Sequence, residues 1–549
     1  MKLETKNFDN LDFDKQCQII SSSPVREKGD LILRSQNPEV IIPSLPCEEF
    51  YVVYSSSSQD IHSELISHAN SEQISFVSDF QCWDKDEINS SNFLNWLGTL
   101  KNADNSPFQK WIVEADFELV VSCFIKFTEV IKTEHLELID DYIGDRPFFS
   151  LDGLYYICID GDNFEVLRES IEVIYGMDKK LYMTLMESLI CANEIEVLEE
   201  AYTLRNQRLA SYGFPEKDEA MQIYVNIDDW SAIEERSVDI DKESSHMEIK
   251  LPSVISENKL YLNEVMNIYY ERYQEDHTIE TELIWLANKI IVCNELDFRD
   301  VETLESAYKR ANNVVSLALE DLSHGKIQIA VDMLKTHWIE TLHRWGITRL
   351  RQLSQFAENI FEESSFDSHT CFMGFLGSPW ESQFKGLLKF YPMKAKSNSD
   401  TEIIEFEDFS NLKEVKIMFN KLQDLKNILE FLKNKYAEDF KSFQNRKKSI
   451  KNFNSLIAGL IINSANKLPV FDKVTEIVLK DFVKTAFDNT KPFRKLKESV
   501  KSKIMETIYS NSDSMENHPV LENIFSRIEE EIGNLDTNSA IEMKYISIL

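Results

Sequence analysis

Hydrophobic residues recur every three or four positions along most of the chain, which is the spacing of one face of an α-helix. Within residues 1–145 this pattern forms short amphipathic segments separated by polar breaks, among them CEEFYVVYSS, QDIHSELISHA and FELVVSCFIKFTEVI. Short helices cannot bury an apolar face alone, so they must stack on one another. We therefore predict an irregular, superhelical helical-repeat region over residues 1–145.

The pattern changes after this region. The stretch FFSLDGLYYICIDGDN, residues 148–163, is rich in aromatic and β-branched residues and ends in the turn signature Asp160-Gly161-Asp162. It predicts one or two strands. Because helical spacing then resumes, we predict a small α+β unit over residues 146–235.

The remainder of the chain is predicted to be helical, with two interruptions. Polar and charged residues that include Pro252 predict a linker or long loop over residues 236–258. A second break, PMKAKSNSDTEIIEFEDFSN, predicts a linker over residues 391–410 that can hold a short strand. The helical patterns on either side predict a central bundle at 259–390 and a C-terminal helical region at 411–549. The predicted fold class is therefore mainly α, built of several units.

Length and charge refine this picture. At 549 residues the chain is too long for a single core, and its 43% of hydrophobic residues suffices for several packed interiors. The whole formal charge of −35 lies in the first 400 residues, because residues 401–549 hold equal numbers of basic and acidic side chains. Such an acidic surface repels nucleic-acid phosphates and anionic lipid, and it favours basic protein partners.

The eight cysteines stand well apart without a C-x-x-C pair, which argues against a zinc module or a disulfide scaffold. We interpret them as buried, reduced thiols, and Cys82, followed by Asp84 and Asp86, as a core residue rather than a nucleophile. The N-terminus lacks the apolar core of a signal peptide, and the longest apolar run, Leu456 to Ile462, is too short for a membrane helix. The sequence therefore predicts a cytoplasmic protein without membrane insertion or cofactor.

The densest group of special-purpose residues lies in LRNQRLASYGFPEKDEAMQIY, residues 204–224. Gly213 follows a helical run and can end it in the left-handed conformation, with Phe214 making the apolar contact of such a cap. Pro215 is then predicted to begin a new helix, where its missing amide hydrogen costs nothing. The stretch is therefore interpreted as a structural corner.

Two arginines of the same stretch are the main candidates for a polar site. Arg205 and Arg208 are three positions apart on one helix face, so they can bind an acidic group. That group can be Glu219 within the corner, or the carboxylate or phosphate of a ligand, with Tyr224 as a further member of the cluster. The structural interpretation is favoured because arginines at helix ends usually pair within the fold.

Other chemistry finds little support. In THWIETLHRW, Glu340 and His343 form the E-x-x-H half-site of di-iron bundles, with His337 on nearly the same face, but the chain holds no second copy. We therefore favour packing over metal binding. The acidic turns DGDN and LIDDYIGDR lack calcium-hand spacing, and no G-x-S-x-G, H-E-x-x-H or phosphate-loop pattern occurs.

Basic residues interleave with apolar ones in KSFQNRKKSIKNF and KPFRKLKESVKSKIM, within the electrically neutral tail. A basic amphipathic helix can bind nucleic acid, anionic lipid or an acidic protein surface, including the acidic part of this chain. The favoured interpretation is an ordinary solvated helix face.

Several of these stretches also carry a resemblance. DFQCWDKDEI, SLDGLYYI, YTLRNQRLASYGFPEKDEAMQIY, HRWGITRLRQLSQFA, LGSPWESQFKGLL and FNSLIAGLIINSANKL occur in the order seen in a large, mostly helical bacterial family, domain of unknown function 6178. The chain resembles this family over nearly its whole length, and the resemblance implies no activity and no catalytic residue. SLPCEEFYVV and ANSEQISFVSDF are also similar to the stacked helices of the cytoplasmic domain of magnesium transporters.

Three functional hypotheses follow. The first is a non-enzymatic scaffold or adaptor whose stacked helices bind protein partners. The second is an enzyme or ligand-binding protein with a polar pocket near Arg205, Arg208 and the helix at 337–344. The third is nucleic-acid binding through the basic C-terminal helices, which the acidic remainder of the chain opposes. The sequence predicts no oligomeric state.

Overall fold

A computed structural model of the chain shows a mainly α protein, as predicted. The structure describes residues 8, 11–23, 25–104, 106–133, 146–159, 164–236, 260–273, 278–296, 301–396, 405–436, 453–469, 474–488, 494–509 and 518–532. Several sequence predictions fall outside these residues: most of the 236–258 linker, the DGDN turn, nearly all of LIDDYIGDR, and most of KSFQNRKKSIKNF.

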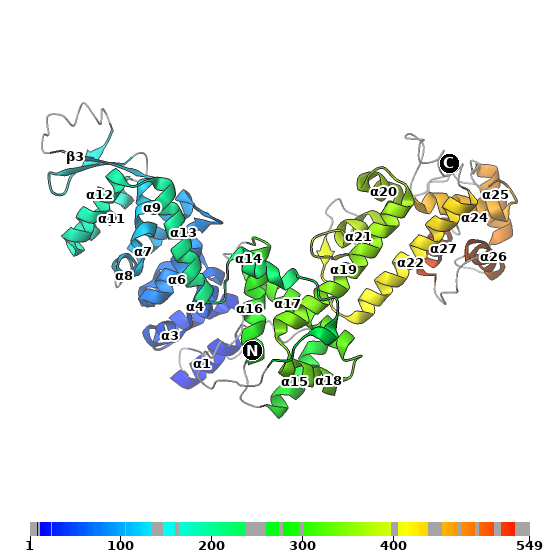
Figure 1. Ribbon diagram of the computed structural model, residues 1–549, viewed down its shortest axis with the longest axis horizontal. Helices are drawn as coiled ribbons and strands as arrows, with labels where there is room; N and C mark the ends of the chain where they lie inside the picture. The colour runs from blue at the N-terminus through cyan, green and yellow to red at the C-terminus, as the bar shows by residue number, and fades with distance from the viewer. Residues whose placement is uncertain are drawn as a thin grey trace.

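The described helices form two arms that meet at an angle, so that the molecule has the outline of a V (Figure 1). The N-terminal arm consists of short stacked helices: α1 (Phe13–Ser22), α2 (Val25–Leu33), α3 (Pro38–Ser44), α4 (Cys47–Ser56), η2 (Gln59–Ile61), α5 (His62–His68), α6 (Ser71–Gln81), α7 (Ser90–Asn102), α8 (Pro107–Glu114), α9 (Phe117–Ile125), α11 (Phe164–Met177), α12 (Lys179–Cys191) and α13 (Glu194–Ser211).

Longer helices build the base of the V and the second arm (Figure 1). They and their short connecting helices are α14 (Lys217–Ala220), η4 (Met221–Tyr224), η5 (Trp230–Ala232), α15 (Tyr261–Arg272), α16 (Thr278–Cys293), α17 (Val301–Leu322), α18 (Ile327–Thr336), α19 (Ile339–Ser364), α20 (His369–Leu376), α21 (Trp380–Leu387), α22 (Leu412–Lys435), α24 (Phe453–Ala465), α25 (Glu476–Ala486), α26 (Glu498–Tyr509) and α27 (Pro519–Ile532).

Local sequence explains where many of the helices begin. The amide oxygen of Asn70 accepts from the N–H of Gln73 at 2.8 Å, and the Gln73 side chain accepts from the N–H of Asn70 at 3.1 Å. This reciprocal capping box satisfies two amides that the first turn of α6 would otherwise leave unpaired. Asp178 and Asn411 cap α12 and α22 with a side-chain oxygen in the same way.

The strands are few and short. The larger sheet has the antiparallel order β3-β5-β4, formed by β3 (Thr128–Lys132), β4 (Phe148–Phe149) and β5 (Tyr155–Ile159). Thr128 pairs with Ile159 and Phe148 with Cys158, so β5 is the central strand, and each of its residues is buried. Two hairpins of two-residue strands complete the set: β1 (Trp83–Asp84) with β2 (Glu87–Ile88), and β6 (Lys394–Ala395) with β7 (Phe406–Glu407).

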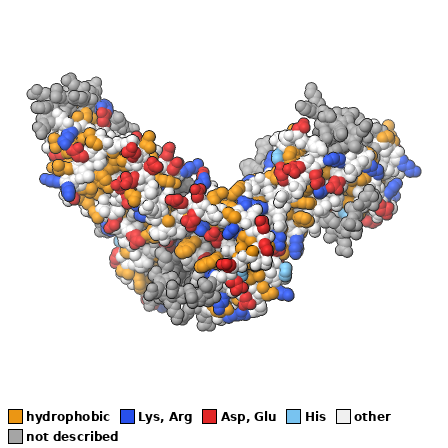
Figure 2. Space-filling view, in the orientation of Figure 1, with side chains coloured by type: hydrophobic (Ala, Val, Ile, Leu, Met, Phe, Trp, Pro, Cys, Tyr) orange, Lys and Arg blue, Asp and Glu red, His pale blue; other side chains and the backbone are white. Residues whose placement is uncertain are grey.

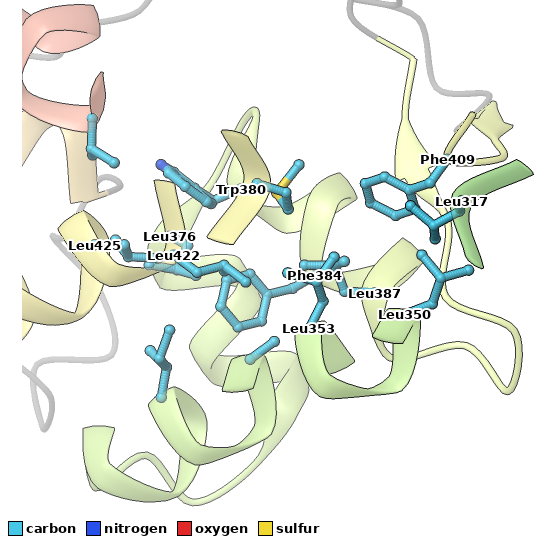
Figure 3. Packing of buried hydrophobic residues seen from close by; sticks show 14 of the residues in the cluster. Leu317, Leu350, Leu353, Leu376, Trp380, Phe384, Leu387, Phe409, Leu422 and Leu425 are labelled. Carbon is cyan, nitrogen blue, oxygen red and sulfur yellow. The ribbon is translucent and has the colours of Figure 1, made fainter. Parts of the chain in front are cut away.

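Buried apolar residues form two large clusters that meet near the corner. One runs from Phe8 to Phe214 and fills the N-terminal arm, and the other runs from Ile223 to Ile532. Figure 3 shows part of the second, where Leu353 of α19, Phe384 of α21 and Leu422 of α22 converge. The short stretch between the two clusters therefore fixes how the arms are joined. The division of the chain at residues 145, 235, 258, 390 and 410 stays a prediction.

The cysteines differ in exposure more than the sequence suggested. Cys47, Cys82, Cys123 and Cys158 are buried, whereas Cys191 and Cys371 are exposed. Burial raises the pKa of the Cys82 thiol well above its usual range, and the adjacent Cys123 adds to the effect. Cys82 is therefore a poor nucleophile in this environment.

Candidate functional site at the corner

The corner is a helix end followed by a reversal of the chain. Gly213 has a φ of +78°, its N–H donates to the carbonyl of Ala210, and the N–H of Phe214 donates to the carbonyl of Leu209 at 2.9 Å. Phe214 is 8% exposed and its ring lies 5.4 Å from that of Phe80. The left-handed glycine thus ends α13 and directs the next residue into the first core.

The prediction that Pro215 begins a new helix is wrong by two residues. The helix α14 begins at Lys217, because Glu216 still has an extended backbone with φ −60° and ψ 153° and serves as the N-cap. Pro215 lies in the extended connection, where its fixed φ and missing amide hydrogen are equally well tolerated.

Replacing Gly213 with alanine is expected to lower the free energy of unfolding by more than about 1 kcal/mol, because a Cβ is strained at positive φ. That Cβ would also lie 2.4 Å from Cδ1 of Trp285, so the half-exposed indole must move. Gly213→Asn should recover part of the backbone cost only. Urea denaturation measures both variants, and Gly153→Ala is the control, since its φ is +73° and no atom of the described residues lies within 4 Å of the added Cβ. Equal losses at the two glycines would show that the Trp285 contact costs nothing.

Arg208 forms an ion pair with the buried carboxylate of Asp79. Its Nε and Nη2 donate to the two carboxylate oxygens of Asp79 at 3.0 and 2.8 Å, and its Nη1 binds Asp116. Asp79 is 1% exposed. Burial raises the pKa of Asp79, and the hydrogen bonds from Arg208 oppose that shift. A two-point pair of this kind holds α13 against α6.

Arg205 lies beside this pair but makes different contacts. It is 7% exposed, its Nε donates to the carbonyl of Asp79 at 2.8 Å, and its Nη1 donates to the carbonyl of Lys85 at 3.5 Å. Its guanidinium lies 5.2 Å from the ring centre of Trp83. Burial lowers the pKa of Arg205, although Asp79 partly offsets this. Its hydrogen bonds among the described residues therefore go to carbonyl oxygens and not to a carboxylate.

A cavity of about 380 Å³ opens beside Arg205, between the two clusters of buried residues. The N-terminal arm contributes aromatic walls from α6, β1 and α13, and the corner and the end of α16 close the other side. Arg208 and the helix at 337–344 do not line it. Of the residues that the sequence suggested for a polar pocket, only Arg205 therefore lines this cavity.

The other candidates lie elsewhere. Glu219 is not a partner of the arginines, because it lies 3.7 Å from Nζ of Lys289, which also pairs with Glu340 at 2.7 Å. Tyr224 is buried, and its hydroxyl accepts from Nδ2 of Asn294 at 3.1 Å. Tyr224 belongs to the second core and Glu219 is exposed beside a lysine of α16, so the structure separates both from Arg205 and Arg208.

The three metal candidates do not converge. His337 is the C-cap of α18, not a residue of α19, and its ring lies 4.9 Å from that of Trp230. Glu340 is paired with a lysine, and His343 is fully buried against the carbonyl of Ile223. No group of three His, Cys, Asp or Glu side chains suited to a metal ion occurs among the residues that the structure describes.

A second polar group, largely buried and centred on α17, was not predicted from the sequence. Arg310 Nε lies 3.5 Å from the carboxylate of Asp408, and the guanidinium lies 4.3 Å from the ring centre of Tyr391. Burial raises the pKa of both Asp408 and Tyr391. These residues come from separate elements, and no local pattern in the sequence marks them as neighbours.

His343 predicts a pH dependence of stability. Burial lowers its pKa to about 3, whereas an unfolded chain has a histidine pKa of about 6.5. The unfolded state therefore binds a proton that the folded state refuses, so stability present above about pH 6.5 is lost as the pH falls, by up to about 1.4 kcal/mol per pH unit. Urea midpoints between about pH 7 and pH 4.5 should fall less steeply for His343→Asn than for the natural chain. His324→Asn, at an exposed residue of positive φ, should keep the natural slope; unchanged slopes in both variants would contradict the assignment.

The fold and the corner define a class of protein: stacked helices in two arms, with candidate polar residues engaged mainly in internal pairs. The chain matches the Family of unknown function (DUF6178) over residues 5–549, and it therefore belongs to that family. No curated protein and no solved structure matches the chain. The similarity to magnesium transporters is not shown by these comparisons. Among the described residues, no helix is long and apolar enough to cross a membrane.

Proposed function

We propose that the protein is a non-enzymatic cytoplasmic scaffold or adaptor that binds a basic protein partner. One observation carries the proposal: three large apolar side chains are exposed on α12 and at the start of α13, with exposed glutamates near Ile190 and Ile195 and with Lys179 and Lys180 in the turn before Met183. Met183 and Ile190 are 48% and 39% exposed and lie seven positions apart on α12, and Ile195 of α13 is 75% exposed. Large apolar side chains that are exposed together and surrounded by polar residues are typical of protein interaction sites.

The charges around these side chains indicate the kind of partner. Four exposed glutamates stand in the first two turns of α13: Glu194, Glu196, Glu199 and Glu200. Figure 2 shows hydrophobic and acidic side chains side by side over the visible face of the N-terminal arm. Exposed apolar side chains with glutamates beside them suit an amphipathic helix with basic edges, and electrostatic attraction would speed its binding.

The test compares matched surface variants in a pull-down from the native cell, using the full chain. A double variant, Ile190→Lys and Ile195→Lys, should lose the stoichiometric partner that the natural chain recovers. The control Ile477→Lys should retain it, because Ile477 is also 74% exposed but lies on α25 of the other arm. The purified partner should bind more weakly as salt rises. Absence of a stoichiometric partner, or equal recovery by the double variant, would refute the proposal.

Nucleic-acid binding by the tail has less support. Lys501 lies 3.0 Å from Glu529 and its Nζ is 3.4 Å from Glu498, and Nζ of Lys497 donates to the carbonyl of Thr485. Two lysines of the described basic stretch thus already have partners within the fold. Neutralised side chains release fewer counterions from a phosphate backbone and add less affinity.

A further inference from the structure

The cavity at the corner combines features that internal packing alone does not require. Its inner wall is aromatic and apolar, with Trp83, Phe80 and Tyr202 from the arm and Phe214 from the corner. Its volume of about 380 Å³ lies within the range of small-molecule sites, roughly 300–1,000 Å³. Apolar walls with a few polar groups that converge are the usual composition of such sites.

Arg205 supplies the converging polar group. Among the described residues it is the one arginine of the cavity wall, and it reaches the cavity although it is only 7% exposed. A guanidinium has five N–H donors, and in Arg205 only Nε has a short bond, since the bond from Nη1 to Lys85 is 3.5 Å long. Donors without strong acceptors in a buried wall favour an anionic ligand group.

The rim of the cavity carries the opposite charge. Asp84, Asp86 and Glu216 line it and are exposed, whereas Glu295 is shared between two lysines. With Lys85 and Lys217 included, the rim holds four acidic and two basic side chains, so it is net negative beside the buried Arg205. A cationic group at the rim and an anionic group at the inner wall would each lie near opposite charge.

Two residues of the cavity wall have left-handed backbone and form an ion pair. Lys85 and Glu295 have φ of +60° and +49°, although neither is glycine, and Nζ of Lys85 lies 3.5 Å from the carboxylate of Glu295 across the cavity. Left-handed backbone is ordinary both in the turn of a two-residue hairpin and at the end of a helix, and these are the places of Lys85 and Glu295. One of the two residues belongs to the β1–β2 turn and the other follows α16, so their ion pair joins the two cores over the cavity.

We propose that this cavity binds a small aromatic zwitterion, of the class of the aromatic α-amino acids. Its carboxylate would accept from Arg205, its ring would lie against Trp83 and Phe214, and its ammonium group would face Asp84 and Asp86. Each contact uses a different part of the ligand, so loss of any one group should weaken binding. The inference does not rest on the scaffold proposal, because neither Ile190 nor Ile195 lines the cavity.

Isothermal titration calorimetry of the full chain with L-phenylalanine, L-tyrosine and L-tryptophan tests the proposal. At least one of them should bind with a dissociation constant below roughly 1 mM. 2-Phenylethylamine lacks the carboxylate and 3-phenylpropionate lacks the ammonium group, so each should bind at least about tenfold more weakly than phenylalanine. Leucine keeps both charges without the ring and should also bind more weakly.

Two variants locate the binding. Arg205→Lys keeps the positive charge but loses the planar fork, and it should weaken binding at least about tenfold. Asn206 also lines the cavity, is half-buried, and has no side-chain hydrogen bond among the described residues. Asn206→Trp should therefore fill the cavity and abolish binding while the melting temperature stays unchanged, which keeps the test valid if Arg205→Lys destabilises the arm.

Three results would overturn the proposal. No heat of binding from L-phenylalanine or L-tryptophan at roughly 5 mM, or from L-tyrosine at roughly 2 mM, would exclude the ligand class at this site. Equal binding of phenylalanine and phenylethylamine would exclude the carboxylate contact, and undiminished binding by a folded Asn206→Trp variant would place the ligand elsewhere.

Discussion

Replacing Arg208 with alanine should lower the free energy of unfolding by about 3–5 kcal/mol, the cost of leaving a buried charge without its partner. Asp79, 1% exposed, would keep its carboxylate inside the first core while losing both hydrogen bonds from the guanidinium. Asp116, which shares Arg208, would lose its partner as well. Urea denaturation followed by circular dichroism measures the loss.

The control is an arginine whose ion pair is exposed. Arg168 pairs with Glu172 at 2.8 Å, with side chains 42% and 39% exposed, so Arg168→Ala should cost less than about 1 kcal/mol. A further variant, Asp79→Leu with Arg208→Met, should recover much of the stability, since an apolar pair can replace a buried ion pair. A loss at Arg208 no larger than that at Arg168 would contradict the assignment of a buried pair.

A second large effect is expected at Asp424 of α22, in the other core. Its carboxylate is fully buried, accepts from the N–H of Val520 at 2.8 Å at the start of α27, and binds the hydroxyl of Tyr509 at the end of α26. Asp424→Ala leaves two donors without an acceptor, so the free energy of unfolding should fall by about 2–5 kcal/mol. Denaturation monitored by hydrogen exchange of α26 and α27 should show the loss there first.

A double-mutant cycle separates the contributions at Asp424. Tyr509→Phe should cost about 1 kcal/mol in the natural chain and close to nothing once Asp424 is alanine, because the hydrogen bond is then already lost. Asp424→Asn keeps one acceptor oxygen, so its free energy of unfolding should lie between those of the natural chain and Asp424→Ala. Additive costs of Tyr509→Phe and Asp424→Ala would show that the two side chains do not interact.

Helical periodicity made most of the fold predictable from the sequence, because a repeat of three and four residues encodes a buried helix face locally. It failed at β3, where the apolar segment FELVVSCFIKFTEVI was interpreted as one helix. The structure ends α9 at Ile125 and pairs Thr128–Lys132 with β5. A short apolar run is compatible with either element, and only the distant partner strand decides.

At the candidate site, too, some features could be predicted from local sequence and others could not. The left-handed turn at Gly213 depends on the glycine itself and on its immediate neighbours, so local sequence suffices to predict it. The partner of Arg208 does not follow from local sequence, because Asp79 lies 129 positions away. The cavity wall likewise combines Trp83, Arg205 and Val292, which only the packed fold brings together.

The separation of Asp79 from Arg208 also has a consequence for synthesis on the ribosome. A chain elongates at about 5–20 residues per second, so the 129 positions from Asp79 to Arg208 take roughly 6 to 26 seconds to appear. During that interval α6 has emerged but the guanidinium that neutralises its carboxylate has not. The nascent N-terminal arm must therefore keep Asp79 hydrated or protonated, and its core closes only when α13 arrives to complete it.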